Sequence, residues 1–520
     1  MTHRETKSCL VACLLCCGIV AALTACTRQL PSQYDETDRL PKIYPDYTDV
    51  TIPVNIAPLT FMLDEEADGM MARYSVVDSP SGQGGQEIVC DGKMQPSIDD
   101  WHELVATAKG GAIQVDVFAR HNDRWTHYRP FHINVSTDSI DPWLSYRVIP
   151  PSYISYEALT ISQRCLENYD ERVIYDNLLC GKEKDGQCIN CHNYQQYNPE
   201  RMQFHARQTH GGTVIAYDGK LKKLDMRCDS ILSAGVYPAW HPWLRLIVYS
   251  TDKTLQSFHT TDPNKIEVYD TASDLIAYDI DHGEVTNIEN DPDEFEVFPA
   301  WAPDGRTLYY CSAHFVRDNS IKDASVDVVH HIDSLRYSLY RKSFDPETMQ
   351  FGPKEHIWSE ASAVLPRISP DGRYLLFTVA DHGYFHIWHH DADLWLLDLE
   401  ALKEGVDSIG VAAARPLTEI NSNDTESYHT WSSNGRWVVF SSRRDDGVFT
   451  RPFFAHFDGE GRFSKPFELP AAEPDYHRQL MKCYNIPELM RGPVTIDPHT
   501  FADILKGAGE PVKYVNTLRH

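Results

Sequence analysis

The sequence is short of positive charge and of long hydrophobic runs. Its 520 residues include 48 Lys and Arg against 75 Asp and Glu, which gives a formal net charge of −27 at pH 7. This balance argues against nucleic acid or an anionic membrane surface as a partner, because both attract basic proteins. The apolar stretch 9–23 is too short and too early to be a membrane span.

The N-terminus instead has the pattern of an export signal. Two basic residues precede the apolar stretch, and Leu23-Thr24-Ala25-Cys26 follows it. Small residues before such a cysteine resemble a bacterial lipobox, in which Cys26 is lipidated; an ordinary signal peptide is the alternative. We predict a lipoprotein signal at 1–26 and a linker at 27–47. The expected location is the bacterial cell envelope, lipid-anchored and either periplasm-facing or associated with the outer membrane.

A single Cys-x-x-Cys-His motif is present, Cys188-Ile189-Asn190-Cys191-His192. Its spacing suits coupling of both haem vinyl groups to the thiols, with the imidazole ligating iron. Half of a zinc site or a redox dithiol would need a second ligand pair or a strand-helix-strand context, and neither pattern is visible. The motif predicts one covalent haem c on Cys188 and Cys191, with His192 as the axial iron ligand.

The distal iron ligand would decide between electron transfer and catalysis, because an open position admits a substrate. The preferred candidates are His205 and Met202; an open site or another ligand, such as His210, Tyr194 or Tyr197, is the remaining possibility. On a strand the His205 and Met202 side chains would point to opposite faces, and on a helix they would share one.

Six other cysteines remain after the signal, the lipobox and the motif. An even number in an oxidising compartment permits disulfides, of which Cys165–Cys180 is the first to test, and free buried thiols are equally compatible. The six are Cys90, Cys165, Cys180, Cys228, Cys311 and Cys483.

Composition and patterning favour β structure, with 31 Pro, 27 Tyr and 11 Trp. Alternating segments predict a β-sandwich at 48–140, with one short helix near 100–108. A haem segment is predicted at 141–211. Within it, apolar residues between Tyr156 and Asn177 have an imperfect helical spacing, so a short helix is expected beside the porphyrin.

After residue 212 a strand-turn-strand pattern repeats. Its copies at 238–245, 299–306, 366–373 and 429–436 each end in arginine, and each precedes a buried apolar strand. Glycine supplies the positive φ of the tight turn in the last three copies. Repeated four-stranded sheets with a fixed aromatic and turn signature are typical of a β-propeller.

These copies resemble the TolB-like propeller repeat, in which a Trp-Ser-Pro-Asp-Gly turn joins two strands; residues 241–244 depart from it. The resemblance implies a TolB-like β-propeller of five or six blades at 212–475, with a closing segment at 476–520. With the lipobox and haem motif, the stretches 427–434 and 441–447 are similar to exported Bacteroidota lipoproteins related to cytochrome c. A fainter similarity links the arrangement to the α subunit of hydrazine synthase.

A histidine-rich loop forms a second candidate site. His382, His386, His389 and His390 lie close to carboxylates, so they could bind a divalent metal. Hydrogen-bonded or exposed histidines are the alternative.

The leading hypothesis is a membrane-anchored monohaem cytochrome c that transfers electrons. Its propeller face would dock a redox protein or a small-molecule substrate. One alternative is a haem-dependent oxidoreductase with an open iron site. Another is an envelope scaffold whose propeller binds protein or glycan, with a structural or sensory haem.

Overall fold

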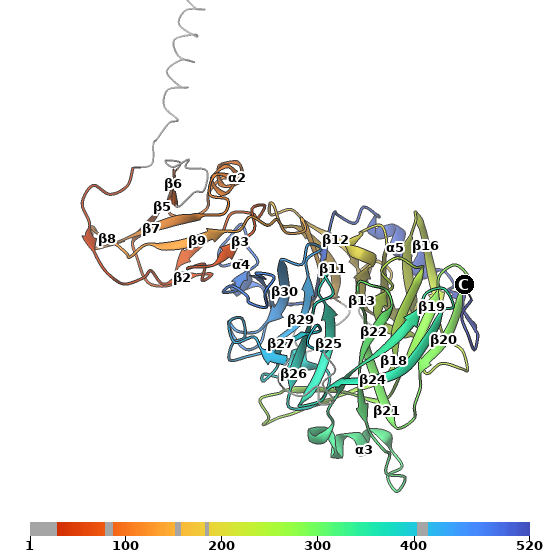
Figure 1. Cartoon of the computed structure of the whole chain (residues 1–520). Coiled ribbons are helices and arrows are strands. Elements are labelled where there is room, and N and C mark those ends of the chain that lie inside the picture. Colours follow the sequence, from red (N-terminus) through yellow and green to blue (C-terminus); the bar gives the residue numbers. More distant parts are fainter. Residues whose placement is uncertain (1–28, 78–86, 151–157, 182–186, 403–413, 520) are drawn as a thin grey trace, which may run out of the picture.

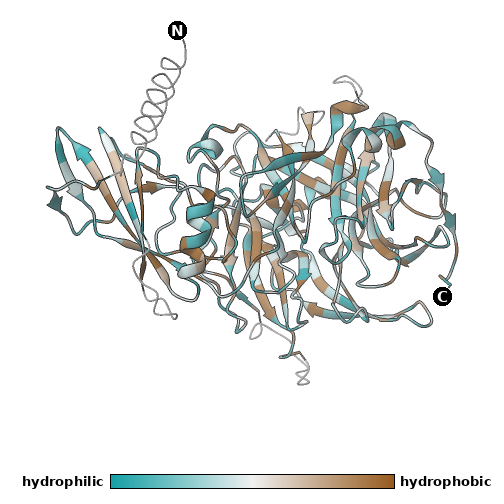
Figure 2. Ribbon diagram, turned by 90° about the horizontal axis from the view of Figure 1, so that it is seen from above, coloured by the Kyte–Doolittle hydropathy of each residue, from teal (hydrophilic) through white to brown (hydrophobic). Residues whose placement is uncertain are grey.

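The computed structural model describes residues 29–77, 87–150, 158–181, 187–402 and 414–519. The predicted signal and the lipobox Cys26 lie outside the described residues. The described chain is mainly β, as predicted, and folds into an N-terminal unit beside a larger group of sheets (Figure 1). Figure 2 shows the most hydrophobic segments running along the strands inside both parts.

The N-terminal unit is built on one seven-stranded sheet of order β1-β8-β7-β5-β6, with β9 paired to β7 and β3 to β9. Its strands are β1 (Asp35–Glu36), β3 (Thr51–Ile52), β5 (Gly69–Val77), β6 (Glu87–Asp91), β7 (Ala112–His121), β8 (Arg124–His127) and β9 (Phe131–Val135). A separate pair joins β2 (Ile43–Tyr44) to β4 (Met62–Leu63). The two-sheet sandwich stays a prediction.

The short helix predicted in this unit is confirmed as α2 (Ile98–Thr107). Ser97 caps it by accepting a hydrogen bond from the Asp100 N–H, which satisfies one of the free amides of the first turn. The helix buries Trp101 edge-on against Tyr74, with ring centroids 6.0 Å apart. Helix and sheet therefore share one core.

The larger part contains five sheets of four, five, nine, four and four strands in a propeller-like arrangement. Without the two-residue strands of the chain end, we divide these sheets into six groups of four strands. They are β10 (Trp143–Ile149), β11 (Thr160–Cys165) and β12 (Glu171–Asp176) with β33 (Cys483–Met490); β13 (Cys188–Tyr194), β14 (Met202–Arg207), β15 (Gly212–Tyr217) and β16 (Lys220–Asp225); β17 (Gly235–Trp240), β18 (Leu246–Phe258), β19 (Ile266–Asp279) and β20 (Glu284–Glu289); β21 (Glu294–Trp301), β22 (Thr307–His314), β23 (Ser338–Asp345) and β24 (Gln350–Trp358); β25 (Ser362–Ile368), β26 (Tyr374–Ala380), β27 (Asp393–Asp398) and β28 (Ala414–Pro416); and β29 (Glu426–Trp431), β30 (Trp437–Ser442), β31 (Arg451–His456) and β32 (Phe467–Glu468). A single pair, Ser273 with Phe295, joins the third group to the fourth.

The innermost strands of the six groups form a closed ring. β13 contacts β17, and the contacts continue through β21, β25 and β29 to β33, which returns to β13. β33 comes from the C-terminal part of the chain and pairs antiparallel with β10, from before the repeats. The ring is thus closed by strands more than 300 residues apart in sequence, and blue and orange ribbons lie together in Figure 1.

Beyond β33, the chain end covers the outside of the sheets. Helix α5 (Pro498–Lys506) packs Phe501 against Phe204, and β34 (Glu510–Pro511) and β35 (Lys513–Tyr514) add parallel pairs to β16 and β20. Two shorter helices, α3 (Ala324–His330) and α4 (Tyr476–Gln479), lie in connections. None of the helices in the described ranges has the length and apolar character needed to cross a membrane.

The predicted turns are present in the repeats. Gly305, Gly372 and Gly435 have φ of 57°, 76° and 67°, a conformation that costs glycine little. In the last copy the Ser432 hydroxyl accepts a hydrogen bond from the Trp437 N–H, 2.9 Å away. The Ser432 hydroxyl therefore fixes the start of the strand that follows the turn.

The first copy departs from this pattern because His241 stands at the position that Ser432 has in the last copy. His241 Nδ1 accepts a hydrogen bond from the Leu244 N–H at 3.0 Å, and its Nε2 lies 2.9 Å from the Gly305 carbonyl oxygen. Trp243 packs so closely on the neighbouring turn that a Cβ at Gly305 would lie 2.4 Å from its ring. This turn is thereby locked to the next sheet.

The helix predicted between Tyr156 and Asn177 is wrong within the described part of that segment. Residues 160–165 and 171–176 form β11 and β12, which pair antiparallel with each other, and β11 also pairs with β10. Leu159, Ile161 and Ile174 share one core, whereas Leu166 lies in the core of the N-terminal unit and Val173 is exposed, so the helical spacing was a coincidence of two strands. Strand pairing supplies the backbone hydrogen bonds that a helix would have made internally.

Cys165 and Cys180, the pair named as the first disulfide to test, are not bonded to each other. All eight cysteines of the described residues are free. The Cys180 thiol lies 2.8 Å from the Tyr175 hydroxyl. The outcome is the free-thiol alternative.

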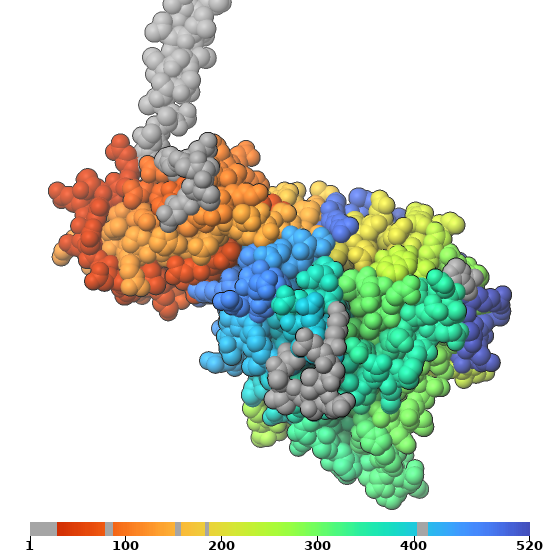
Figure 3. Space-filling model, viewed as in Figure 1, coloured from red at the N-terminus to blue at the C-terminus, as the bar shows by residue number. Residues whose placement is uncertain are grey.

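The N-terminal unit packs directly on the β29–β32 sheet, and the two form a continuous surface in Figure 3. Trp437 and Val439 belong to the same hydrophobic core as the N-terminal sheet. At the border the Asp141 carboxylate accepts two hydrogen bonds from Ser433, from its N–H and its hydroxyl, both at 2.6 Å.

Replacing Trp437 should destabilise both parts, since its side chain is fully buried in the shared core. We expect Trp437→Ala to lower the free energy of unfolding by about 3–5 kcal/mol, the usual cost of removing a buried aromatic side chain. Urea unfolding followed by circular dichroism measures this. Val173→Ala, at an exposed position of β12, is the matched control and should change little; an equal loss in both variants would contradict the shared core.

Candidate functional site

Each innermost strand has a β-bulge at the same place, and each bulge holds a non-glycine residue in the left-handed region. For such side chains this conformation is rare and costs on the order of 1–3 kcal/mol. The six are Cys191 (φ 57°), Tyr237 (47°), Phe298 (53°), Leu365 (55°), Tyr428 (46°) and Ile486 (53°), and strand register shifts beside each. The repeat of this feature around the ring indicates that the closed arrangement of sheets imposes it.

These six side chains line the narrowest part of the central channel, which we name the constriction. Its cavity is about 40 Å³, room for little more than one water molecule. Residues that follow the bulges line a second cavity. A third cavity is lined by Cys188 and Asn190, which precede the β13 bulge, and by residues of β10, β14, β18 and β19.

The Cys-x-x-Cys-His motif lies on β13, the innermost strand of the second group. Cys188 is half-buried and borders a cavity of about 380 Å³, the Cys188 cavity, together with Arg147 and Arg207. Cys191 is the bulge residue and lines the constriction; burial raises the pKa of its thiol. The two thiols thus border different cavities.

His192 follows the bulge and is 1% exposed. The corresponding position holds proline in four other innermost strands and His429 in the last; the prolines are Pro238, Pro299, Pro366 and Pro487. The His429 Nε2 lies 3.0 Å from the Leu376 carbonyl oxygen of the neighbouring sheet. His192 lies near the backbone of Ser145 and Ile486, but neither of its ring nitrogens has a hydrogen-bond partner among the described residues, and burial lowers its pKa to about 3.

This geometry does not fit iron ligation by His192. The imidazole is wedged between two sheets, and the cavity it lines, the constriction, has only about 40 Å³. A porphyrin is many times larger than this space. As the chain is folded here, His192 serves as a neutral contact between sheets, equivalent to the prolines.

The two candidate distal ligands lie on β14, and a strand places them on opposite faces. Met202 is fully buried in the core that also contains Ile189 and Phe204. The His205 Nδ1 is 3.0 Å from the Thr213 hydroxyl, and burial lowers the pKa of this histidine to about 3. Each side chain has a structural role, and a distal ligand stays a prediction.

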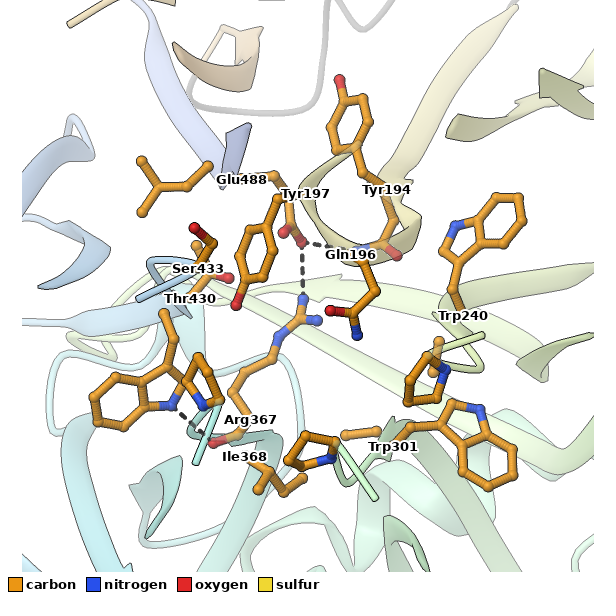
Figure 4. A pocket seen from close by; sticks show the side chains of 18 residues that line it. Tyr194, Gln196, Tyr197, Trp240, Trp301, Arg367, Ile368, Thr430, Ser433 and Glu488 are labelled. Atoms are coloured by element: carbon orange, nitrogen blue, oxygen red, sulfur yellow. Dashed lines mark hydrogen bonds and ion pairs between the residues drawn. The ribbon is translucent and has the colours of Figure 1, made fainter. Parts of the chain in front are cut away.

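The cavity lined by residues that follow the bulges has about 170 Å³, and we name it the tryptophan funnel (Figure 4). Aromatic side chains and turn prolines line it. They are Trp240, Trp301, Trp431, Tyr194, Tyr197, Pro242, Pro303 and Pro370. Polar groups make up more of the exposed lining than apolar ones, so the cavity combines aromatic side chains with groups that can hydrogen-bond a ligand.

A charged network lies at the centre of the funnel. Arg367 donates to the Glu488 carboxylate at 3.0 Å, and the Asn193 side-chain amide donates to the same oxygen at 3.0 Å. Burial raises the pKa of Glu488, although Arg367 opposes this shift. In Figure 4 the guanidinium and carboxylate meet between Tyr197 and Gln196.

The sequence analysis did not identify the Arg367–Glu488 pair. The signal was a departure from the repeat, because Arg367 occupies the place of Ala239 and Ala300 in the earlier copies. Glu488 was hidden because β33 had been assigned to a closing segment and not to an innermost strand.

The histidine-rich loop is only partly assembled as predicted. His382 and His389 meet at Glu267, a residue of β19 that the sequence did not suggest. His386 turns away, with its Nε2 3.1 Å from the Gly383 carbonyl oxygen, and the backbone N–H of His390 donates to Asn264.

Comparisons with known proteins give only fold-level likeness. No family model matches the sequence, and no curated protein matches it. Among solved structures, TolB from Acinetobacter baumannii is 12% identical with a TM-score of 0.40, covering 76% of this chain and 85% of that one. The periplasmic gluconolactonase of Pseudomonas aeruginosa is 10% identical with a TM-score of 0.27, covering 63% and 68%. The class that the structure itself defines is a mainly β protein with propeller-like sheets.

The structural role of His192 can be tested by a proline substitution. We expect His192→Pro to fold with nearly unchanged thermal stability, because proline occupies the equivalent place elsewhere and the β13–β14 pairing skips residues 191 and 192. Thermal unfolding of the purified protein measures this.

His192→Asp is the contrasting variant, since it buries an unpaired carboxylate and should unfold or lose several kcal/mol. Equal damage by proline and aspartate would contradict the equivalence of the six innermost strands.

Proposed function

We propose that this protein is an envelope-anchored, six-bladed TolB-like propeller that binds a ligand in the tryptophan funnel. Six groups of four strands around a closed ring support the blade count. The lipobox at Cys26 supports export and anchoring. The observation that carries the binding function is the Arg367–Glu488–Asn193 network in the funnel.

The ion pair of this network is only partly buried, because the Arg367 side chain keeps 31% exposure while that of Glu488 keeps 9%. Ion pairs with one exposed partner usually add little to stability, so folding does not require this pair. The equivalent positions of Arg367 in the third and fourth groups hold alanine. A guanidinium that donates beside a carboxylate that accepts can bind a neutral group with both capacities, such as an amide or hydroxyl.

The funnel walls define the other half of the recognition. Trp240, Trp301 and Trp431 come from three different four-strand groups and supply rigid aromatic rings to the lining. Aromatic anchors around buried polar groups are the usual centre of binding energy in protein interfaces. The proposed ligand is therefore a narrow polar segment of an envelope partner, inserted from the side of the turns.

Site-specific photocrosslinking tests this proposal in intact cells. We expect p-benzoylphenylalanine at Ile368, inside the funnel, to give a discrete adduct. The same probe at Val316, which is 62% exposed and outside the funnel, should not give this adduct. Adding Arg367→Met should reduce the Ile368 adduct at least about tenfold, because it leaves Glu488 without its partner. Equal adducts at both positions, or none in the funnel, would contradict funnel binding.

Covalent haem is a second candidate, favoured by the motif spacing and by the free thiols of Cys188 and Cys191. It would require the contact around His192 to open before iron could be ligated. Electron transfer and haem-dependent oxidoreductase activity both depend on this candidate. A haem would also leave the propeller as the docking surface for a redox partner or substrate.

A pyridine haemochrome assay on the full-length protein, expressed with a c-type maturation system, tests this candidate. Attached haem predicts a haemochrome spectrum that Cys188→Ser alters and a loss of thiol reactivity at both motif cysteines. Colourless protein with both thiols still reactive after denaturation would exclude it, leaving the binding propeller.

A further inference from the structure

We propose that Glu267, His382 and His389 form a divalent metal site, selective for zinc-like ions, that clips the β18–β19 hairpin to the loop between β26 and β27. The three residues offer ligand atoms that all lie within 4.8 Å of one another. Two imidazoles and one carboxylate are a donor set that zinc uses with a fourth position left for water or substrate.

The spacing of the ligand atoms suits a tetrahedral ion. The Glu267 Oε2 is 3.1 Å from the His389 Nε2 and 3.7 Å from the His382 Nε2. Zinc–ligand bonds of about 2.0–2.1 Å at tetrahedral angles place ligand atoms roughly 3.3 Å apart. The observed separations lie on either side of this value, so a small movement of His382 would complete the geometry.

The backbone around the site is arranged for close approach. Gly383 has φ of +69°, and a Cβ there would lie 2.9 Å from the Glu267 Oε1 and 3.2 Å from the His389 ring. Only glycine lets the loop lie this close to both ligands. His389 is further fixed because its carbonyl oxygen accepts a hydrogen bond from the Thr425 hydroxyl at 2.6 Å.

Burial separates the ligands into two fixed residues and one accessible residue. Glu267 and His389 are buried, whereas the His382 side chain retains 20% exposure. An ion could therefore reach the site past His382 and find the other two ligands already placed. Partial exposure also makes His382 the safest position for a test substitution.

Metal at this site would act on the Cys188 cavity. Val268 and Phe385 line that cavity and lie one residue after Glu267 and three after His382. Tyr384 reinforces the same joint, since its hydroxyl donates to Asp270 at 2.9 Å. An ion that joins the hairpin to the loop would restrain this wall of the Cys188 cavity. This effect is independent of the tryptophan funnel.

Zinc titration of the purified full-length protein tests the proposal, with competition against a fluorescent chelator. Cysteines are first blocked with an alkylating reagent, because Cys188 and Cys191 could bind zinc themselves. We expect one zinc per chain and a raised melting temperature on zinc addition, since an ion that binds the folded state stabilises it.

His382→Ala should weaken binding by more than about 100-fold, because even groups behind metal ligands are worth about 10- to 100-fold. His390→Ala removes a neighbouring histidine outside the site and should bind as the parent does. Glu267→Gln keeps the side-chain shape and should lose binding too. No zinc uptake by the thiol-blocked parent, or equal affinity of the His382→Ala variant, would overturn the site.

Discussion

Pairing of β10 with β33 is the constraint on which the sheets depend. It brings a strand from before the repeats against a strand from the C-terminal part, so the ring closes through hydrogen bonds and not only through side-chain packing. Loop closure over more than 300 residues has an entropic cost that grows only slowly with length. Several hydrogen bonds and the buried side chains of β33 offset that cost.

Closure also explains why the innermost strands are alike. Six strands that converge on one axis must each turn aside at the same depth, and a bulge with a left-handed residue provides that turn. The strain is tolerated because neighbouring sheets determine the backbone from both sides. Side chains at the bulges then fill the axis, and the constriction follows from the same geometry.

This geometry bears on the Cys-x-x-Cys-His motif. A sequence of five residues specifies spacing along the chain, whereas haem attachment also needs space around the histidine. On β13, Cys191 is the bulge residue and His192 is the residue after it. The five other innermost strands have residues at both of these positions although they carry no haem motif. Prolines or a histidine occupy the place of His192 in the other innermost strands, but both buried nitrogens of His192 lack a hydrogen-bond partner among the described residues.

The repeats were predictable because glycine turns and buried strands are local features, and each copy confirmed the others. The helix predicted between Tyr156 and Asn177 was wrong, because the spacing of apolar residues alone cannot distinguish one helix from two short strands. Glu267 could not be found beside His389 by any local pattern, since 122 residues separate them and only the folded sheets bring them together. Arg367 was visible in the sequence as a break in the repeat, but its partner Glu488 was not.

The departures from symmetry point to function more reliably than the motif does. In a ring of equivalent strands, folding requires the same backbone six times but sets few demands on individual side chains. The position two residues after the bulge holds alanine in two strands, at Ala239 and Ala300, but polar or charged residues in the other four, which are Asn193, Arg367, Thr430 and Glu488. Folding does not require the charged ones, because alanine serves at the same place. Cys191 is the other departure, since it is the smallest of the six bulge side chains. Its thiol lines the same small cavity as the five larger bulge side chains.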